Sequence, residues 1–197
     1  MNDTILDRWD ITSEELTEVI DQNPSLRGMI FGYLAELKLE KLWLSGEEMS
    51  NVTKHDDHNR KKKGDRVVRY KGHEFIFESK SLQTSTIKKT ENGWSGKAQV
   101  DASDRREITL PDGSKVTTTC LLRGEFDILA VNIFAFENRW RFVFVKNSDL
   151  PTSMYRRYTE YQRQHLLSTL IEVQWPPRPP FSEEPFTLMN QIIQNRI

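Results

Sequence analysis

The feature that most constrains the fold of this chain is a change of hydrophobic period between residues 26 and 81. From Leu26 to Leu44, apolar residues recur with the 3.6-residue period of a helix, at positions 26, 29, 30, 33, 34, 37 and 44. Beyond a possible strand near 48–54, "RVVRY" and "HEFIFESKS" follow a period near 2, and the dipeptide "KG" separates them. The chain therefore predicts a helix followed by a β-meander.

Later segments complete an α/β pattern. The runs "FDILAVNIFAF" and "WRFVFV" are almost continuously apolar, which is typical of central strands covered on both faces. The segment "REITLPDGSKVTTTCLL" predicts a hairpin with Gly113 in the left-handed conformation, whereas 82–104 has no clear period. "TSEE" predicts a capped acidic helix to about Gln22, "TEYQRQHLLSTLIEVQW" is helical at least in its first half, and Ser182 is the expected cap of a last helix. We expect a mixed central sheet flanked by helices.

Length and composition indicate one domain. We assign residues 1–175 to a single domain with its core at 26–145, and 176–197 to a Pro-rich spacer and a terminal helix that packs on the same domain. With 37% hydrophobic and 29% charged residues, the chain is neither disordered nor collagen-like. It has no run of 18 apolar residues and no signal-peptide pattern, so we expect no membrane contact and a cytoplasmic location.

Charge is unevenly distributed although the net charge is only −1. Residues 54–71 carry eight bases against three acids, and a local basic patch is typical of nucleic-acid binding. The candidates are Arg60, Lys61, Lys62 and Lys63, with Lys97, Arg105 and Arg106 as further bases that a phosphate strand could contact. The alternative is a solvated loop, which is the usual role of a charge run taken alone.

Two carboxylates meet if the hairpin has a two-residue turn at Lys71–Gly72. Tyr70 then faces His73, and continuing the register sets Asp65 opposite Glu78, with Cβ atoms about 5 Å apart. Like charges so placed repel, and a divalent cation removes the repulsion. Asp65, Glu78 and the backbone carbonyl of Ser79 suit Mg²⁺ or Mn²⁺.

Lys80 lies on the same side of the strand as Glu78, where it can orient a nucleophile for phosphodiester hydrolysis. Asp57, in the preceding loop, is an alternative first metal ligand, and a surface ion-pair ladder is the alternative role of the whole group.

The segment "GDRVVRYKGHEFIFESKS" resembles the motif of the PD-(D/E)XK nuclease superfamily, in which an acid begins one strand and Glu-x-Lys ends the next. The resemblance implies a restriction-endonuclease-like core. The family often has a further active-site glutamate on the preceding helix, and Glu36 in "RGMIFGYLAELKLEKLW" is the matching residue. Gly64 stands where the family has proline, and the family's second core helix has no clear counterpart.

The resemblance implies a Mg²⁺-dependent endonuclease of restriction, defence or mobile-element type, with Asp65, Glu78, Lys80 and Glu36 as active-site residues. The preference for double-stranded DNA as the substrate also comes from the resemblance to the family. Many members of the family are homodimers, and the oligomeric state of this chain stays open. The alternative is a catalytically inactive module of the same fold that binds nucleic acid or protein.

Overall fold

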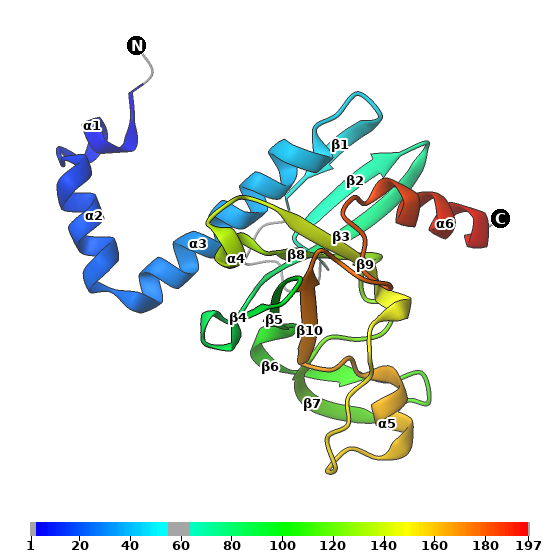
Figure 1. The fold of residues 1–197 in the computed structure, drawn as a ribbon. Coiled ribbons are helices and arrows are strands. Elements are labelled where there is room, and N and C mark those ends of the chain that lie inside the picture. The colour runs from blue at the N-terminus through cyan, green and yellow to red at the C-terminus, as the bar shows by residue number, and fades with distance from the viewer. Residues whose placement is uncertain (1–2, 55–63, 197) are drawn as a thin grey trace. The chain divides into compact units, whose positions relative to one another are not determined.

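The chain divides into two units of unequal size. The computed structural model describes residues 3–54 and 64–196, and the contacts within it separate Met1–Leu34 from Ala35–Ile197 (Figure 1). The smaller unit contains α1 (Ile5–Trp9), α2 (Ser13–Gln22) and the first part of α3 (Pro24–Leu39). Neither α1 nor α2 contains a buried residue.

Local capping explains where α2 begins. The Thr12 hydroxyl accepts the Glu15 N–H at 3.1 Å, and the Glu15 carboxylate accepts the Thr12 N–H at 2.8 Å. The predicted capping box is therefore confirmed.

The larger unit contains a five-stranded mixed sheet in the order β1-β2-β3-β8-β9. Its strands are β1 (Met49–Thr53), β2 (Arg66–Tyr70), β3 (His73–Ser81), β8 (Ile128–Asn132) and β9 (Phe142–Lys146). The β3–β8 pair is parallel and the other pairs are antiparallel. The predicted mixed central sheet is confirmed, and every residue of β8 is buried, as expected of a strand covered on both faces.

Each face of this sheet has its own core. On one face, Phe75 and Phe77 of β3 pack with Leu39 at the end of α3, with η1 (Glu40–Leu44), and with Leu188 and Met189 of the C-terminal helix α6 (Phe186–Arg196). The opposite face is covered by a second sheet, which consists of β10 (Leu170–Trp175), β5 (Gly93–Gln99) and β4 (Lys88–Thr90). The sheet is thus flanked by helices on one face, as predicted, whereas the second sheet on the other face is not predicted from the sequence.

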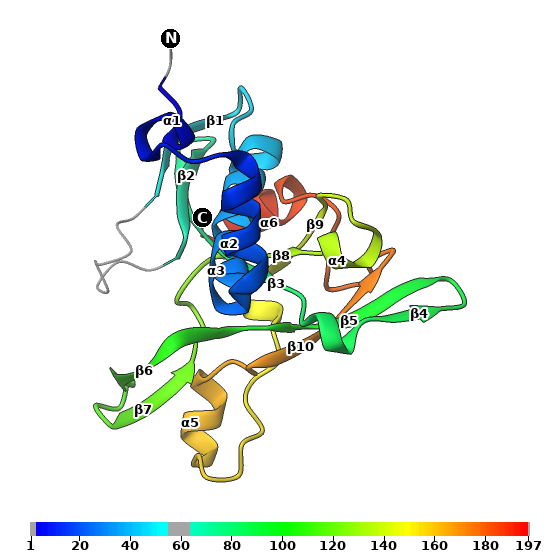
Figure 2. The ribbon, with the colours of Figure 1, turned by 90° about the vertical axis from the view of Figure 1, so that its left-hand side faces the viewer.

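The connection from β3 to β8 differs from the one that the family resemblance implies. It contains a 3₁₀ turn, η2 (Thr84–Thr86), then β4, β5, β6 (Asp101–Thr109) and β7 (Lys115–Cys120), and residues 82–127 include no α-helix. A single residue, Val100, separates β5 from β6, so one long ribbon leads from the second sheet into the β6–β7 hairpin (Figure 2). The hairpin turn has Gly113 at φ +83°, as predicted.

The C-terminal third is part helix and part strand. A helix at its beginning, α5 (Glu160–His165), precedes β10, while α4 (Phe134–Glu137) follows β8. The expected cap at Ser182 is wrong: Glu184 accepts the N–H of Phe186 at 2.7 Å, because α6 begins four residues after Ser182. None of the helices in the described ranges has the length and apolar content that crossing a bilayer requires.

Candidate active site

The β2–β3 hairpin positions the predicted acids. Its register pairs Tyr70 with His73 and Arg66 with Phe77, which confirms the predicted two-residue turn. Lys71 and Gly72 both have positive φ, the conformation that matches the twist of two adjoining strands. The ladder ends at Arg66, one residue short of Asp65.

Asp65 lies just outside the ladder and contacts the end of β3 through both its backbone N–H and its carboxylate. Its backbone N–H donates to the Phe77 carbonyl at 2.8 Å, and its carboxylate Oδ2 accepts the Ser79 N–H at 2.7 Å. The carboxylate is therefore anchored beside Glu78, as the register predicts.

Gly64 explains why this site has no proline before the aspartate. Its φ is +75°, whereas the proline ring fixes φ near −65°. A Cβ at this position would lie 2.3 Å from Cγ2 of Ile76 and 2.9 Å from the Phe77 carbonyl oxygen. The close approach of Gly64 to β3 thus requires glycine, and it sets the chain direction into Asp65.

Lys80 follows Glu78 by two residues and lies on the same face of β3. Its Nζ is 2.8 Å from Glu78 Oε1, and the Glu78 side chain is 11% exposed. Burial lowers the pKa of Lys80, but Glu78 and then Asp65 outweigh burial, so the pKa is raised. Lys80 consequently stays protonated at neutral pH.

The surroundings of the Asp65 carboxyl disfavour its charged form. Burial, and then the negative charge of Glu78, raise its pKa from 3.8 to about 6, although Lys80 and the Ser79 N–H act in the opposite direction. The pair of acids is therefore costly without a further cation.

Glu36 lies at the edge of this group, on α3. Its carboxylate is 2.8 Å from Arg66 Nη1 and 3.3 Å from Lys54 Nζ, and the same Nη1 donates to the Asp65 carbonyl at 2.8 Å. Burial and then Asp65 raise the pKa of Glu36. Glu36 thus stands within electrostatic range of Asp65, but its nearest partners are cations.

The donor set at this place fits Mg²⁺ or Mn²⁺. Two anionic oxygen groups, Asp65 and Glu78, are held together by the backbone, and Mg²⁺ binds one or two protein carboxylates while keeping several waters. In the described part of the chain, no three His, Cys, Asp or Glu side chains form a metal-binding group. The pair suits a cation that shares its ligands with water and phosphate, and it does not suit a closed protein cage.

The predicted nucleic-acid contacts lie in two regions. Lys97 is exposed on β5, opposite Glu172 of β10, and Arg105 is exposed on β6. Asp57 and the bases Arg60, Lys61, Lys62 and Lys63 lie outside the described residues.

Two acids near the site have no signal in the sequence pattern. Asp101, at the start of β6, contributes to the raised pKa of Lys80, and Glu125 pairs with Arg106 at 2.5 Å. Both belong to the long β3–β8 connection, in which the sequence predicts the β6–β7 hairpin but neither of these pairings.

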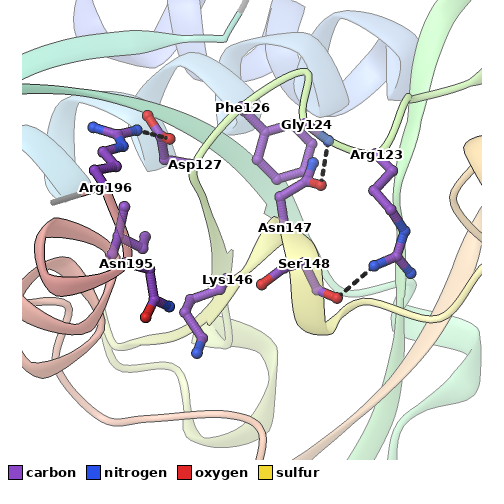
Figure 3. A pocket seen from close by; sticks show the side chains of 10 residues that line it. Arg123, Gly124, Phe126, Asp127, Lys146, Asn147, Ser148, Asn195 and Arg196 are labelled. Carbon is purple, nitrogen blue, oxygen red and sulfur yellow. Dashed lines mark hydrogen bonds and ion pairs between the residues drawn. The ribbon is translucent and has the colours of Figure 1, made fainter. Parts of the chain in front are cut away.

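A cavity of about 300 Å³ lies beside the start of β8, lined by Arg123, Asp127, Lys146 and Arg196 among others (Figure 3). Arg123 donates to the carbonyl of Ser148, Lys146 pairs with Asp149, and Arg196 pairs with Asp127. Because each of these three cations already has a partner, the cavity is a weak candidate for anion binding.

No protein-family model matches the chain, and no curated protein matches it. Among solved structures, the chain is similar to the bacterial homing endonuclease I-Ssp6803I, with 16% sequence identity and a TM-score of 0.33. The similarity covers 68% of this chain and 85% of that one. A TM-score at this level does not place two chains in one fold.

Proposed function

We propose that the chain is a Mg²⁺-dependent endonuclease of PD-(D/E)XK type that hydrolyses phosphodiester bonds in DNA. The observation that supports this proposal is that the side chains of Asp65 and Glu78 lie beside each other at the C-terminal end of β3. Nζ of Lys80 lies 2.8 Å from Oε1 of Glu78 at the same place. A structural sheet gains nothing from two adjacent carboxylates, whereas a cation site requires them.

Asp65 and Glu78 hold the cation in this proposal, and the carbonyl of Ser79 is a further ligand. Mg²⁺ in such a site supplies Lewis-acid polarisation of a phosphoryl oxygen. The Ser79 N–H holds the Asp65 carboxylate in place, so Asp65 itself needs little reorganisation when the cation binds.

Lys80 positions the attacking water and stabilises negative charge on the phosphate. Its raised pKa keeps the ammonium protonated, so Lys80 acts as a donor and not as a general base. Glu36 assists from α3, where it orients Arg66 next to Asp65.

The substrate in this proposal is double-stranded DNA, held through Arg60, Lys61, Lys62, Lys63, Lys97 and Arg105. Neutralising these bases weakens binding at every sequence, since phosphate contacts carry no sequence information. The proposal leaves open whether the enzyme acts as a homodimer.

Cleavage of plasmid DNA with Mg²⁺ or Mn²⁺ tests the proposal. We expect nicking by the wild type, and loss of nicking in Asp65→Asn and Glu78→Gln. Glu74→Gln is the matched control, because Glu74 lies on the same face of β3 but is exposed. Intact plasmid, linear duplex and single strands after incubation with the wild type and either metal would contradict the endonuclease activity and leave the alternative of a binding module without catalysis.

A further inference from the structure

The β6–β7 hairpin contains a large irregularity. Asp101 pairs with Cys120 and Arg106 pairs with Thr118, so β6 takes five residue steps where β7 takes two. Such bulges re-aim side chains and are over-represented next to active sites. Ser103, Asp104 and Arg105 are exposed within the bulge, whereas Arg106 is only partly exposed.

A buried acid fixes the guanidinium of Arg106. Nη1 and Nη2 of Arg106 each lie 2.5 Å from one oxygen of Glu125, in a two-pronged pair. The Glu125 side chain is 5% exposed, and its Oε2 also accepts the Leu122 N–H at 2.7 Å. This geometry is rigid, since the acceptor is itself held by the backbone.

Arg106 retains donors that the pair with Glu125 does not use. A guanidinium has five N–H groups, and Nε of Arg106 is buried without a hydrogen-bond partner in the described part of the chain. A buried donor without a partner destabilises the protein and is uncommon. The side chain as a whole is 33% exposed, so part of it is open to a ligand.

The loop that carries Glu125 is attached to the strand that carries Glu78. Two residues after Glu125, the N–H of Asp127 donates to the Ile76 carbonyl at 2.9 Å, and its Oδ2 accepts the Ile76 N–H at 2.8 Å. The Glu125 hydrogen bonds raise the pKa of Arg106 against the effect of burial, and the negative charge of Glu78 adds to the increase. Arg106 therefore lies within electrostatic range of the Glu78 carboxylate.

We propose that Arg106 is a phosphate-binding residue of the hairpin site and that Glu125 is the positioning residue that orients its guanidinium. The inference rests on the proposed function, because it assumes that a nucleic-acid phosphate enters beside Glu78. A planar guanidinium with fixed orientation matches the oxygens of a phosphate diester better than a flexible ammonium does.

The test measures binding of a short DNA duplex by fluorescence anisotropy, without divalent metal, over a series of salt concentrations. Losing one phosphate contact lowers the slope of log affinity against log salt by about 0.9. We expect this loss in Arg106→Gln and retention of the slope in Arg106→Lys, which keeps the charge. In cleavage, both variants are slower than the wild type, because lysine does not reproduce the two-pronged geometry.

Lys115→Gln is the matched control. Lys115 is on the same hairpin and pairs with Glu107 at 2.8 Å, but both side chains are exposed. We expect the wild-type slope and cleavage rate in this variant. Mn²⁺ titration of Arg106→Gln checks that the fold and the carboxylate pair persist.

Arg106→Gln with wild-type Mn²⁺ affinity, salt slope and cleavage rate would overturn the role of Arg106 and leave the nuclease proposal intact. A wild-type protein that neither binds the duplex nor cleaves plasmid would instead overturn the proposed function, and the role of Arg106 with it.

Discussion

Asp65 and Glu78 oppose the stability of the hairpin that holds them. The backbone contacts of Asp65 with Phe77 and Ser79 place its carboxylate where burial and Glu78 both disfavour the charged form. Lys80 offsets part of this cost from the same face. At the residue scale, burial and the charge of Glu78 thus outweigh the nearby cations Lys80 and Arg66, and the charged form of Asp65 stays disfavoured.

Asp65→Asn should stabilise the metal-free protein at neutral pH. The folded-state pKa of Asp65, about 6, lies above the 3.8 of the free side chain, so its favourable contribution is complete below about pH 4 and is lost as the pH rises through 6. Asparagine can still accept the Ser79 N–H and does not titrate. We expect Asp65→Asn to gain stability over the wild type between pH 4 and 7, on the order of 2 kcal/mol.

Urea unfolding in EDTA at several pH values measures this difference. Glu74→Gln, an exposed change on the same face that retains Asp65, should keep the pH dependence of the wild type. If Asp65 belonged to a surface ion-pair ladder, Asp65→Asn would instead lose stability at pH 7.

Lys80→Met should separate metal binding from catalysis. Removing the ammonium leaves both carboxylates for the cation, so Mn²⁺ affinity should persist, while single-turnover cleavage slows by about 100-fold or more. A variant that cleaves at the wild-type rate would show that Lys80 is only a counter-ion of Glu78.

At the scale of elements, the β2–β3 hairpin sets the site because both acids belong to it. Gly64 and Gly72 bracket β2, and both have positive φ. They differ in surroundings: a Cβ on Gly72 meets nothing within 4 Å, whereas one on Gly64 meets the backbone of Phe77. Alanine substitutions at these two glycines therefore separate the cost of backbone strain from the cost of a steric clash.

Gly64→Ala should cost more stability than Gly72→Ala and should weaken the metal site. Both changes strain a left-handed residue, by about 1 kcal/mol. Only Gly64→Ala also pushes the chain away from β3 at the residue before Asp65, which should add at least about 1 kcal/mol and lower Mn²⁺ affinity. Chemical unfolding and Mn²⁺ titration of the two variants check this. Equal losses in both would contradict a positioning role for Gly64.

The same hairpin shows what the sequence could predict. Turn residues at 71–72 and a period of 2 determine the register locally, so Asp65, Glu78 and Lys80 could be brought together from sequence. The ribbon of β5 and β6 could not, because β5 pairs with β10 far along the chain and because Gly93, Gly96 and the β6 bulge interrupt the alternation. For this reason the sequence does not predict the pairing of Arg106 with Glu125.

At the scale of the whole molecule, the larger unit holds every described residue of the candidate site. Residues 35–196 include both cores of the central sheet, and α6 contributes Leu188 and Met189 to one of them. The assignment of 1–175 to a single domain stays a prediction.

Removing residues 1–23 should leave folding and cleavage unchanged. The helices α1 and α2 contain no buried residue, so their loss deprives no core of apolar contacts. We expect the melting temperature to change by less than about 3 °C, which corresponds to about 1 kcal/mol for a chain of this size. A much larger decrease, measured by differential scanning calorimetry, would show that these helices contribute to the stability of the larger unit.

The most direct test of the account is an anomalous-difference map of crystals soaked in Mn²⁺ near pH 7.5. We expect one peak in coordinating contact with the carboxylates of both Asp65 and Glu78, with Lys80 displaced from its ion pair, and no peak in crystals of Glu78→Gln. A map without density at the hairpin, in which Lys80 still pairs with Glu78, would contradict the account, and a peak at Asp57 instead of Asp65 would reassign the first ligand.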